Sequence, residues 1–505
     1  MGQFVRILLA CGVLTLTSCG SGGPITSTAP PSSPSPLLTA AEVQTVVTNA
    51  ASAANVPMVI AVTDRAGNLL ALYNKASAPT TATGNFGVSL PAQEVALGLA
   101  RTASFFSNDQ APLSSRTVRY ISGIHFPPGI DNAANAALYG IENTNRGCPM
   151  NVTFATGKSI APARSVDGSQ LGTGVITGKA DLVDSDPTTV NPGGVPLFKN
   201  GRLVGGVGVV AASPDAAEFA AFNAAAASGF GAAPAAPGVV IIDGVSLPFV
   251  NNTSRPAGLS AGTADGSFAV GPAASTQAPP EDYLVSPVAG PVGGLTQAEV
   301  QGIINQAITT ANTTRAVIRL PDGQRARFAI AIADLDGTIL ALNRMPDATV
   351  FSIDVAVAKA RNLVYLSSTA ANPIDMPGVP AGTAVTNRTI SFGAQPLFPP
   401  GIDNSSQGPF FPLYQYDVAH PCTNGHQTPS ANQNGIVFFP GSVPLYKNGV
   451  LVGALGISGD GVEQDDYVSA QASAGFEPPD AKRADQIMID NVRLPYLKFP
   501  RNPTF

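Results

Sequence analysis

Apolar and polar positions run through the same series of patterns twice along the chain. Each series opens with an amphipathic helix whose first turn has Thr followed three residues later by Glu, at Thr39 and Glu42 and again at Thr296 and Glu299. In the first copy the apolar positions that continue at helical spacing are Val43, Val46, Val47 and Ala50. The pattern therefore predicts two copies of one structural unit.

A β-hairpin and a second helix follow in each copy. Runs rich in Val, Ile and Ala flank an Asp-x-x-Gly turn, which predicts strands at 58–63, 68–73, 328–333 and 338–343. The second helix, with small residues on one face for close packing on a sheet, is predicted at 92–106 and 353–366. A long excursion rich in Pro, Gly and Asn comes next, and then a hairpin that turns at Asn-Gly.

Glycines lie on the returning strand of that last hairpin, at 205–208 and at 453–456. Glycine weakens a strand unless another group must approach the backbone closely. Either a ligand or a helix therefore packs against these strands, and the sequence leaves both readings open.

Literal repetition supports the duplication. Residues 193–205 return as 441–453, and the Pro-Pro-Gly-Ile-Asp-Asn segment at 127–132 returns at 399–404. With 505 residues, each copy has the size of an ordinary domain and can bury its own core. The predicted fold class is α+β, an antiparallel sheet packed with helices in each copy. The predicted segments are 1–19 (lipoprotein signal peptide), 20–36 (Ser/Pro-rich tether), 37–250 (repeat 1), 251–294 (linker) and 295–505 (repeat 2).

Composition changes this picture in one respect. The chain is 44% hydrophobic and 12% charged, with a net charge of -6, and it carries no basic stripe with interleaved aromatics. Because binding to a phosphate backbone depends on clustered Lys and Arg, nucleic acid is excluded as a partner.

The N-terminus predicts export. Arg6 precedes a short apolar run, and Leu16-Thr17-Ser18-Cys19 resembles the bacterial lipoprotein cleavage box, which makes Cys19 the lipidated residue. An ordinary secretory signal cut nearby is the alternative, since the run is too short to span a bilayer. Gly20 after the cysteine carries no acidic retention signal, so resemblance to sorted lipoproteins favours the outer membrane and attachment to the membrane through the lipid.

Export leaves two cysteines in the mature chain, Cys148 and Cys422, one in each repeat. Outside the cytoplasm such a pair can form a disulfide between the repeats. Equivalent residues meet only near the pseudo-twofold axis of the two copies, so two buried thiols or a functional cysteine remain alternatives.

The order of elements and its motifs resemble the GlcG/HbpS-like heme-binding family. In repeat 2 the matching residues are Asp334, Gly337, Asp354, Lys359-Ala360-Arg361, Gly441, Pro444, Gly453, Gly456, Ser458-Gly459 and Gln464-Asp465. In repeat 1 they are Asp64, Gly67, Ala100-Arg101-Thr102, Gly193, Gly194, Pro196, Gly205 and Gly208. The resemblance implies a profilin-like fold, a pseudo-dimer within the chain, a possible higher homo-oligomer, and heme or a related tetrapyrrole as the cofactor.

Departures from the family pattern point to repeat 2 as the ligand site. Both excursions are much longer than the family's connection, and repeat 1 has Leu99 where repeat 2 has Lys359. The resemblance implies that Lys359 and Arg361 meet tetrapyrrole carboxylates near Ser458, above a floor shaped by Gly441 and Pro444. A solvated helix face, a pair with Asp354 and a simple turn are the alternatives.

Two of the three histidines lie in the excursion of repeat 2. His420, Cys422 and His426 offer two imidazoles and a sulfur within one loop, a candidate set for a metal or a heme iron, although the spacing fits no established zinc motif. Exposed histidines beside a structural cysteine are the alternative. His125, next to Phe126, is expected to be packed in an apolar setting.

The sequence therefore favours a cell-envelope lipoprotein that binds heme or a related tetrapyrrole for sensing, scavenging or storage, without enzymatic activity. Phosphate-loop, dinucleotide and nucleophile-elbow motifs are incomplete, and no catalytic set recurs in both repeats. The alternatives are an envelope accessory subunit or enzyme acting on a small oxidised metabolite, and a protein-interaction lipoprotein.

Overall fold

Two five-stranded antiparallel sheets have the same strand order. The computed structural model describes residues 36–231, 241–242, 245–317 and 324–504, so the predicted signal peptide and Cys19 lie outside the described residues. The first sheet runs in the order β11 (Ser267–Val270), β2 (Leu69–Asn74), β1 (Met58–Asp64), β8 (Arg202–Ala211), β7 (Gly194–Lys199). The second runs in the order β12 (Asp282–Val285), β14 (Ile339–Arg344), β13 (Ala329–Ala333), β16 (Val450–Ser458), β15 (Ser442–Lys447).

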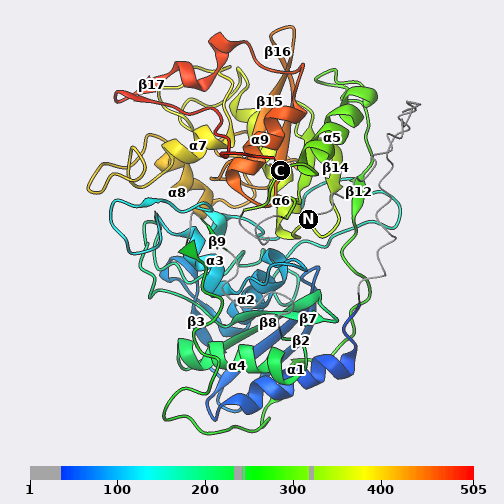
Figure 1. Ribbon diagram of the computed structural model, residues 1–505, viewed down its shortest axis with the longest axis vertical. Coiled ribbons are helices and arrows are strands. Elements are labelled where there is room, and N and C mark those ends of the chain that lie inside the picture. The colour runs from blue at the N-terminus through cyan, green and yellow to red at the C-terminus, as the bar shows by residue number, and fades with distance from the viewer. Residues whose placement is uncertain (1–35, 232–240, 243–244, 318–323, 505) are drawn as a thin grey trace, which may run out of the picture. The chain divides into compact units, whose positions relative to one another are not determined.

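Helices cover both faces of each sheet (Figure 1). On one face lie the paired helices α1 (Ala40–Ala53) and α4 (Pro214–Ala227), or α5 (Gln297–Ala311) and α9 (Val462–Ala472). On the other face lies α2 (Ala92–Phe106) or α6 (Phe351–Leu366). Both central strands are therefore fully buried, and the predicted α+β class with antiparallel sheets and helices is confirmed.

Local sequence signals place the helices where the pattern predicts them. Thr39 and Thr296 each accept the backbone N–H of the Glu three residues later, whose carboxylate accepts the Thr backbone N–H in return. Both capping boxes are thus confirmed. Helices α2 and α6 also match the predicted second helices closely.

A helix packs directly against the strand glycines. A Cβ atom on Gly208 would lie 2.0 Å from the carbonyl oxygen of Ala96 in α2, and one on Gly456 would lie 2.1 Å from that of Ala356 in α6. Any larger residue would push the helix away from the sheet. Of the two readings that the sequence left open, the structure shows close packing of a helix.

The predicted linker contributes a strand to each sheet. Both β11 and β12 lie within 251–294, and they pair with β2 and β14, respectively. β11 follows the rest of its sheet in the sequence, whereas β12 precedes the rest of its own. The linker therefore completes both sheets.

The two excursions hold the remaining α-helices of the described residues and some of the short elements. Their helices are α3 (Ser115–Ser122), α7 (Asn387–Gly393) and α8 (Phe411–Ala419). The short strands of the chain are β3 (Thr81–Thr83), β4 (Ser89–Pro91), β5 (His125–Phe126), β6 (Ala134–Asn135), β9 (Ile241–Ile242), β10 (Val245–Ser246), β17 (Met488–Ile489) and β18 (Val492–Arg493). The 3-10 turns are η1 (Asn85–Gly87), η2 (Ile141–Asn143), η3 (Asp480–Lys482) and η4 (Ala484–Gln486). None of the described helices is long and apolar enough to cross a membrane.

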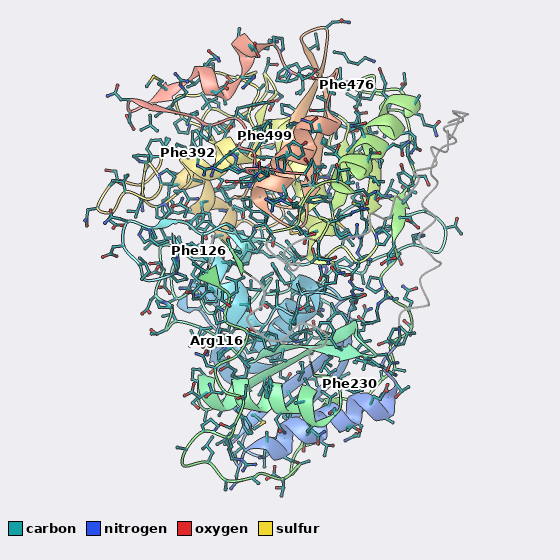
Figure 2. The ribbon with its side chains drawn as sticks, in the orientation of Figure 1. Arg116, Phe126, Phe230, Phe392, Phe476 and Phe499 are labelled. Carbon is teal, nitrogen blue, oxygen red and sulfur yellow. A yellow bond between two sulfur atoms is a disulfide. The ribbon has the colours of Figure 1, made fainter. Side chains whose placement is uncertain are left out.

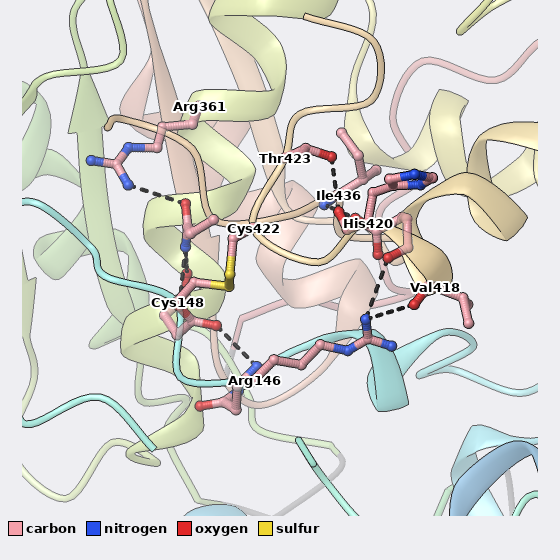
Figure 3. The surroundings of a disulfide bond; sticks show 12 residues. Arg146, Cys148, Arg361, Val418, His420, Cys422, Thr423 and Ile436 are labelled. Carbon is pink, nitrogen blue, oxygen red and sulfur yellow. Dashed lines mark hydrogen bonds between the residues drawn. A yellow bond between two sulfur atoms is a disulfide. The ribbon is translucent and has the colours of Figure 1, made fainter. Parts of the chain in front are cut away.

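The excursions of the two repeats pack against each other. The rings of Tyr139 and Tyr414 stack with centroids 5.1 Å apart, and the buried ammonium of Lys179 lies 4.5 Å from the Tyr139 ring centre. A disulfide joins Cys148 to Cys422, one of the outcomes that the sequence left open (Figure 3). The repeats thus share buried aromatic, cationic and covalent contacts.

Asp417 of α8 is a buried carboxylate at this contact between the excursions. It accepts hydrogen bonds from the amide of Asn143 in the other repeat (2.9 Å) and from the backbone N–H of Ile436 (2.8 Å). Burial raises the pKa of Asp417 from 3.8 to about 6. The folded state therefore holds the proton of Asp417 more tightly than the unfolded chain does.

Asp417→Asn should remove a pH-dependent loss of stability. Because the folded-state pKa is the higher one, the contribution of Asp417 to stability is present below about pH 4 and is lost as the pH rises through about 6. Urea denaturation from about pH 4 to about pH 7 should show the variant gaining up to about 3 kcal/mol on the parent. The exposed Asp131→Asn control should run parallel to the parent, and an Asp417→Asn curve that did the same would contradict the assignment.

Candidate functional site

Lys359 lies in the core of repeat 2, where it forms an ion pair. Helix α6 directs its side chain to Asp465 of α9, with Nζ 3.0 Å from Oδ2, and Nζ also donates to the carbonyl oxygen of Ile457 at 2.7 Å. The Phe439 ring lies 5.0 Å from the same ammonium. Both charged side chains are buried, so these partners account for the placement of Lys359 without a ligand.

Gly441, Ser458 and Pro444 pack around this ion pair or next to it. Gly441 has φ +124°, and a Cβ atom there would lie 2.5 Å from Lys359 Nζ and 2.6 Å from Asp465 Cβ. Ser458 Oγ lies 3.2 Å from Ser352 Oγ, and Pro444 sits in β15 opposite Ala454. Gly441 is thus required because the side chains of Lys359 and Asp465 occupy the space that its Cβ atom would need.

Arg361, two residues after Lys359, has partners elsewhere. Its guanidinium donates to the carbonyl oxygen of Gly337 (2.9 Å), to Asn434 Oδ1 (3.2 Å) and to the carbonyl oxygen of Met150 in repeat 1 (Figure 3). Burial lowers its pKa to about 10, so the group stays charged at neutral pH. Arg361 therefore connects the repeats, and the structure does not bring it together with Lys359 at a cavity.

Lys359→Met should destabilise the fold. The change leaves the Asp465 carboxylate buried without its cation, which costs about 3–5 kcal/mol of unfolding free energy. The exposed Lys498→Met should change stability by less than about 1 kcal/mol. Chemical denaturation measures both, and Lys359→Met with Asp465→Leu should recover most of the loss because an apolar pair can replace a buried ion pair. Equal midpoints for the Lys359 and Lys498 variants would disprove the structural role.

The two histidines of the loop both pack against the ring of Tyr416. The Tyr416 ring lies 4.0 Å from the His420 ring and 3.9 Å from the His426 ring. His420 is exposed, and its Nδ1 lies 3.0 Å from the carbonyl oxygen of Tyr416. Cys422, the third residue of the predicted set, is bonded to Cys148 and is not a thiolate.

Across the described residues, no group of three or more His, Cys, Asp or Glu side chains is arranged to hold a metal ion. The set His420, Cys422 and His426 is therefore not a metal centre in this structure. His125 is buried, as expected, and its Nε2 lies 2.8 Å from Asp403 Oδ1 of the other repeat.

A cavity of about 870 Å³ lies beside His426 in repeat 2. The end of α6, the turn between β15 and β16, η3 and the loop around His426 form its walls. Tyr365, Tyr446 and Lys482 line it together with His426. Of the predicted site residues only His426 lines this cavity.

His426 is held by a buried carboxylate. Its Nδ1 lies 2.6 Å from Asp375 Oδ1, and Asp375 also accepts the hydroxyl of Tyr365 at 2.6 Å and the backbone N–H of His426 at 3.0 Å. A carboxylate only accepts, so Nδ1 carries the proton and the neutral ring keeps its lone pair on Nε2. A carboxylate-oriented imidazole with a basic Nε2 can bind a metal or accept a proton.

The phenols of the cavity stay neutral. Burial, and then the bond to Asp375, raises the pKa of Tyr365, and burial raises the pKa of Tyr446 to about 12. Lys482 lies 5.7 Å from the Tyr446 ring centre and donates to the carbonyl oxygen of Gly449. The cavity thus offers an imidazole, two neutral phenols and the Lys482 ammonium, together with the Asp336 carboxylate and several Ser and Thr hydroxyls.

The cavity arises where repeat 2 is longer than repeat 1. After α2, Ser107 and Leu113 exchange two hydrogen bonds across 6 residues, whereas after α6 Ser367 and Val385 exchange the same two bonds across 18. The longer segment supplies Asp375 and part of the cavity wall. An alignment of the two repeats shows this length difference, and that is the one signal by which sequence reasoning could have found the site.

Each half is an α+β domain in which an antiparallel sheet lies between helices. Residues 295–474, which lie in repeat 2, match the family model described as "Haem degrading protein HbpS-like". That match contains β13 to β16 and the cavity residues up to Leu451.

Three known proteins are similar to this chain. The corrinoid adenosyltransferase PduO of Salmonella typhimurium is 27% identical over 163 residues, which are 32% of this chain and 36% of the relative, so the chain spans about a third of that relative's length. The crystal structure of a PduOC–heme complex has 22% identity and a TM-score of 0.24 over 36% of this chain and 94% of its own. Klebsiella pneumoniae protein ORFY has 21% identity and a TM-score of 0.23 over 35% and 88%, respectively.

Proposed function

We propose that this protein binds heme or a related tetrapyrrole in the cavity of repeat 2. The observation that carries the proposal is His426, which lines the cavity while its Nδ1 is fixed by the buried Asp375. This arrangement presents Nε2 as the ring atom that is free to bind iron. The family description of the segment as haem-degrading supports the same ligand.

The residues present fit such a ligand. A volume of about 870 Å³ lies within the usual range of about 300–1,000 Å³ for cofactor sites. Tyr365, Tyr446 and Leu451 offer ring faces and apolar contact, and Lys482 offers a cation for a carboxylate. When bound, the iron of a heme would supply ligand exchange or electron transfer; the residues named here bind it, orient it and limit access of water.

Hemin titration tests the proposal directly. The purified protein should develop a saturable Soret band at one heme per chain, and His426→Ala should weaken binding at least about tenfold because the axial nitrogen is lost. Asp375→Asn should also weaken binding, by about 10–100-fold, through loss of the imidazole's orienting partner.

His420→Ala is the matched control. His420 stacks on the same Tyr416 ring but does not line the cavity, so this variant should bind hemin like the parent. Equal losses in the two histidine variants, or no Soret band with micromolar protein, would contradict the proposal.

A role in the cell envelope is part of the proposal. The lipoprotein box at Leu16–Cys19 and the Ser/Pro-rich tether support attachment to a membrane, most simply the outer membrane. There the protein would sense, scavenge or store its ligand, and it would not need to catalyse a reaction.

Cys19→Ser should release the protein from membranes. Without the lipidated cysteine, the chain should move from the detergent-extracted membrane fraction to the soluble fraction after cell fractionation. Labelling with a radioactive fatty acid should mark the parent and not the variant, whereas labelling of both would place the lipid elsewhere. Cys11→Ser is the control, because that residue lies within the predicted signal.

The pair of His426 and Asp375 also favours a second function. An imidazole whose Nδ1 is held by a carboxylate is a common general base, and the cavity could hold a small oxidised metabolite instead of a tetrapyrrole. In that case hemin would leave the protein colourless, and small carbonyl compounds would raise its melting temperature in a His426-dependent way.

A further inference from the structure

The two repeats place different side chains at one structural position. The glycine contacts described above set α2 and α6 in the same register on their sheets, since Gly208 faces Ala96 and Gly456 faces Ala356. Counting from these contacts, Leu99 in α2 is the counterpart of Lys359 in α6. Repeat 1 thus has an isobutyl group where repeat 2 has a buried ammonium.

The side chains around that position are also polar in repeat 2 and apolar in repeat 1. A Cβ atom on Gly193 would lie 3.3 Å from Ala217 Cβ, and one on Gly441 would lie 2.6 Å from Asp465 Cβ, so Ala217 corresponds to Asp465. The strand pairings Ala61–Gly208 and Ala331–Gly456 make Val210 the counterpart of Ser458.

The surrounding frame is retained while these three positions change. Arg116 of α3 binds Glu218 of α4 (Nε–Oε1 2.6 Å), and Arg388 of α7 binds Asp466 of α9 in the same way; Figure 2 labels Arg116. Repeat 1 therefore keeps the neighbouring ion pair and replaces an ammonium, a carboxylate and a hydroxyl by apolar groups.

A cavity of about 250 Å³ lies where the polar set is missing. Leu99, Val210 and Ala217 line it, and the hairpin of β3 and β4 contributes Thr81 to Thr83 as a further wall. Asn191 also lines it, and its amide donates to the carbonyl oxygen of Thr83 at 2.9 Å. Among the described residues that form these walls, none is charged.

We propose that repeat 1 binds a small, uncharged and largely apolar molecule in this cavity. A charged ligand would lose its hydration without gaining a counter-charge, which excludes ions. The volume exceeds the roughly 150 Å³ of an apolar cavity that holds benzene, and it is below the about 300 Å³ at which drug-sized sites begin. A single or fused aromatic ring with at most one polar group therefore matches the site, and Thr81, Asn191 or Ser213 lies at its wall for that group.

Indole is a suitable probe. The chain contains no tryptophan, so indole fluorescence can be excited beyond tyrosine absorption without background from the protein. Titration of indole with the purified protein should give a saturable blue shift at one site per chain, because the ring leaves water for a cavity in which Val95, Leu99 and Val210 contribute apolar surface.

Two variants close the cavity in different ways. Ala217→Leu fills it from α4 with three carbons, and Leu99→Lys with Ala217→Asp rebuilds the ion pair of repeat 2. Each should weaken indole binding at least about tenfold. The exposed Ala226→Leu lies on the same helix and should bind indole like the parent. Circular dichroism and the melting temperature identify any variant that fails to fold. If one closing variant fails to fold, indole binding by the other tests the proposal.

The indole experiment can succeed or fail independently of the tetrapyrrole site in repeat 2. Hemin binding should be unchanged in the Ala217→Leu variant, and indole binding should be unchanged in His426→Ala. No saturable indole response, or a response that survives both closing variants, would overturn the proposal. Loss of indole binding in His426→Ala alone would assign the probe to the larger cavity and would also overturn it.

Discussion

The structure depends on direct contact between helix backbone and strand backbone. At Gly208 and Gly456 a single methyl group would collide with a helix carbonyl oxygen. This contact sets how close and in which register α2 and α6 lie on their sheets. The residue three positions after Ala96 or Ala356 therefore always points into the same space between the sheet and the N-terminal turns of the following helix. What occupies that space is then decided by side chains alone, a buried ion pair in one half and a small cavity in the other.

The long excursions produce what distinguishes the halves. They carry the disulfide, the Tyr139–Tyr414 stack and the hydrogen bonds of Asp417, and they carry the segment that holds Asp375. Because polar groups are buried among them, each needs a partner, and many of these partners come from the other repeat. The excursions thus join the halves and also form most of the larger cavity.

Local signals explain how far the sequence could predict this structure. Capping boxes, the Asp-x-x-Gly turns and the Asn-Gly hairpins act over a few residues, so the helices and central strands could be placed correctly. The candidate site depends on contacts at long separation: Lys359 with Asp465 across 106 residues and His426 with Asp375 across 51. Without the fold, a lysine that forms a buried ion pair cannot be distinguished from one that binds a ligand. No local sequence pattern identifies Tyr446 or Lys482 as cavity residues. The edge strands β11 and β12 were likewise missed because their pairing partners lie far away in the chain.

Those two edge strands join their sheets from different directions along the chain. Strand β11 is added to its sheet from the C-terminal side of its repeat, and β12 to its sheet from the N-terminal side. A plain tandem copy would have kept the edge strand on one side in both. In this respect the two halves differ from a plain tandem copy. Cutting the chain at either predicted boundary would expose an unpaired strand edge, the kind of surface on which β-proteins aggregate. Neither half carries a whole sheet within its own predicted repeat, so the segment between the repeats is part of both folded halves.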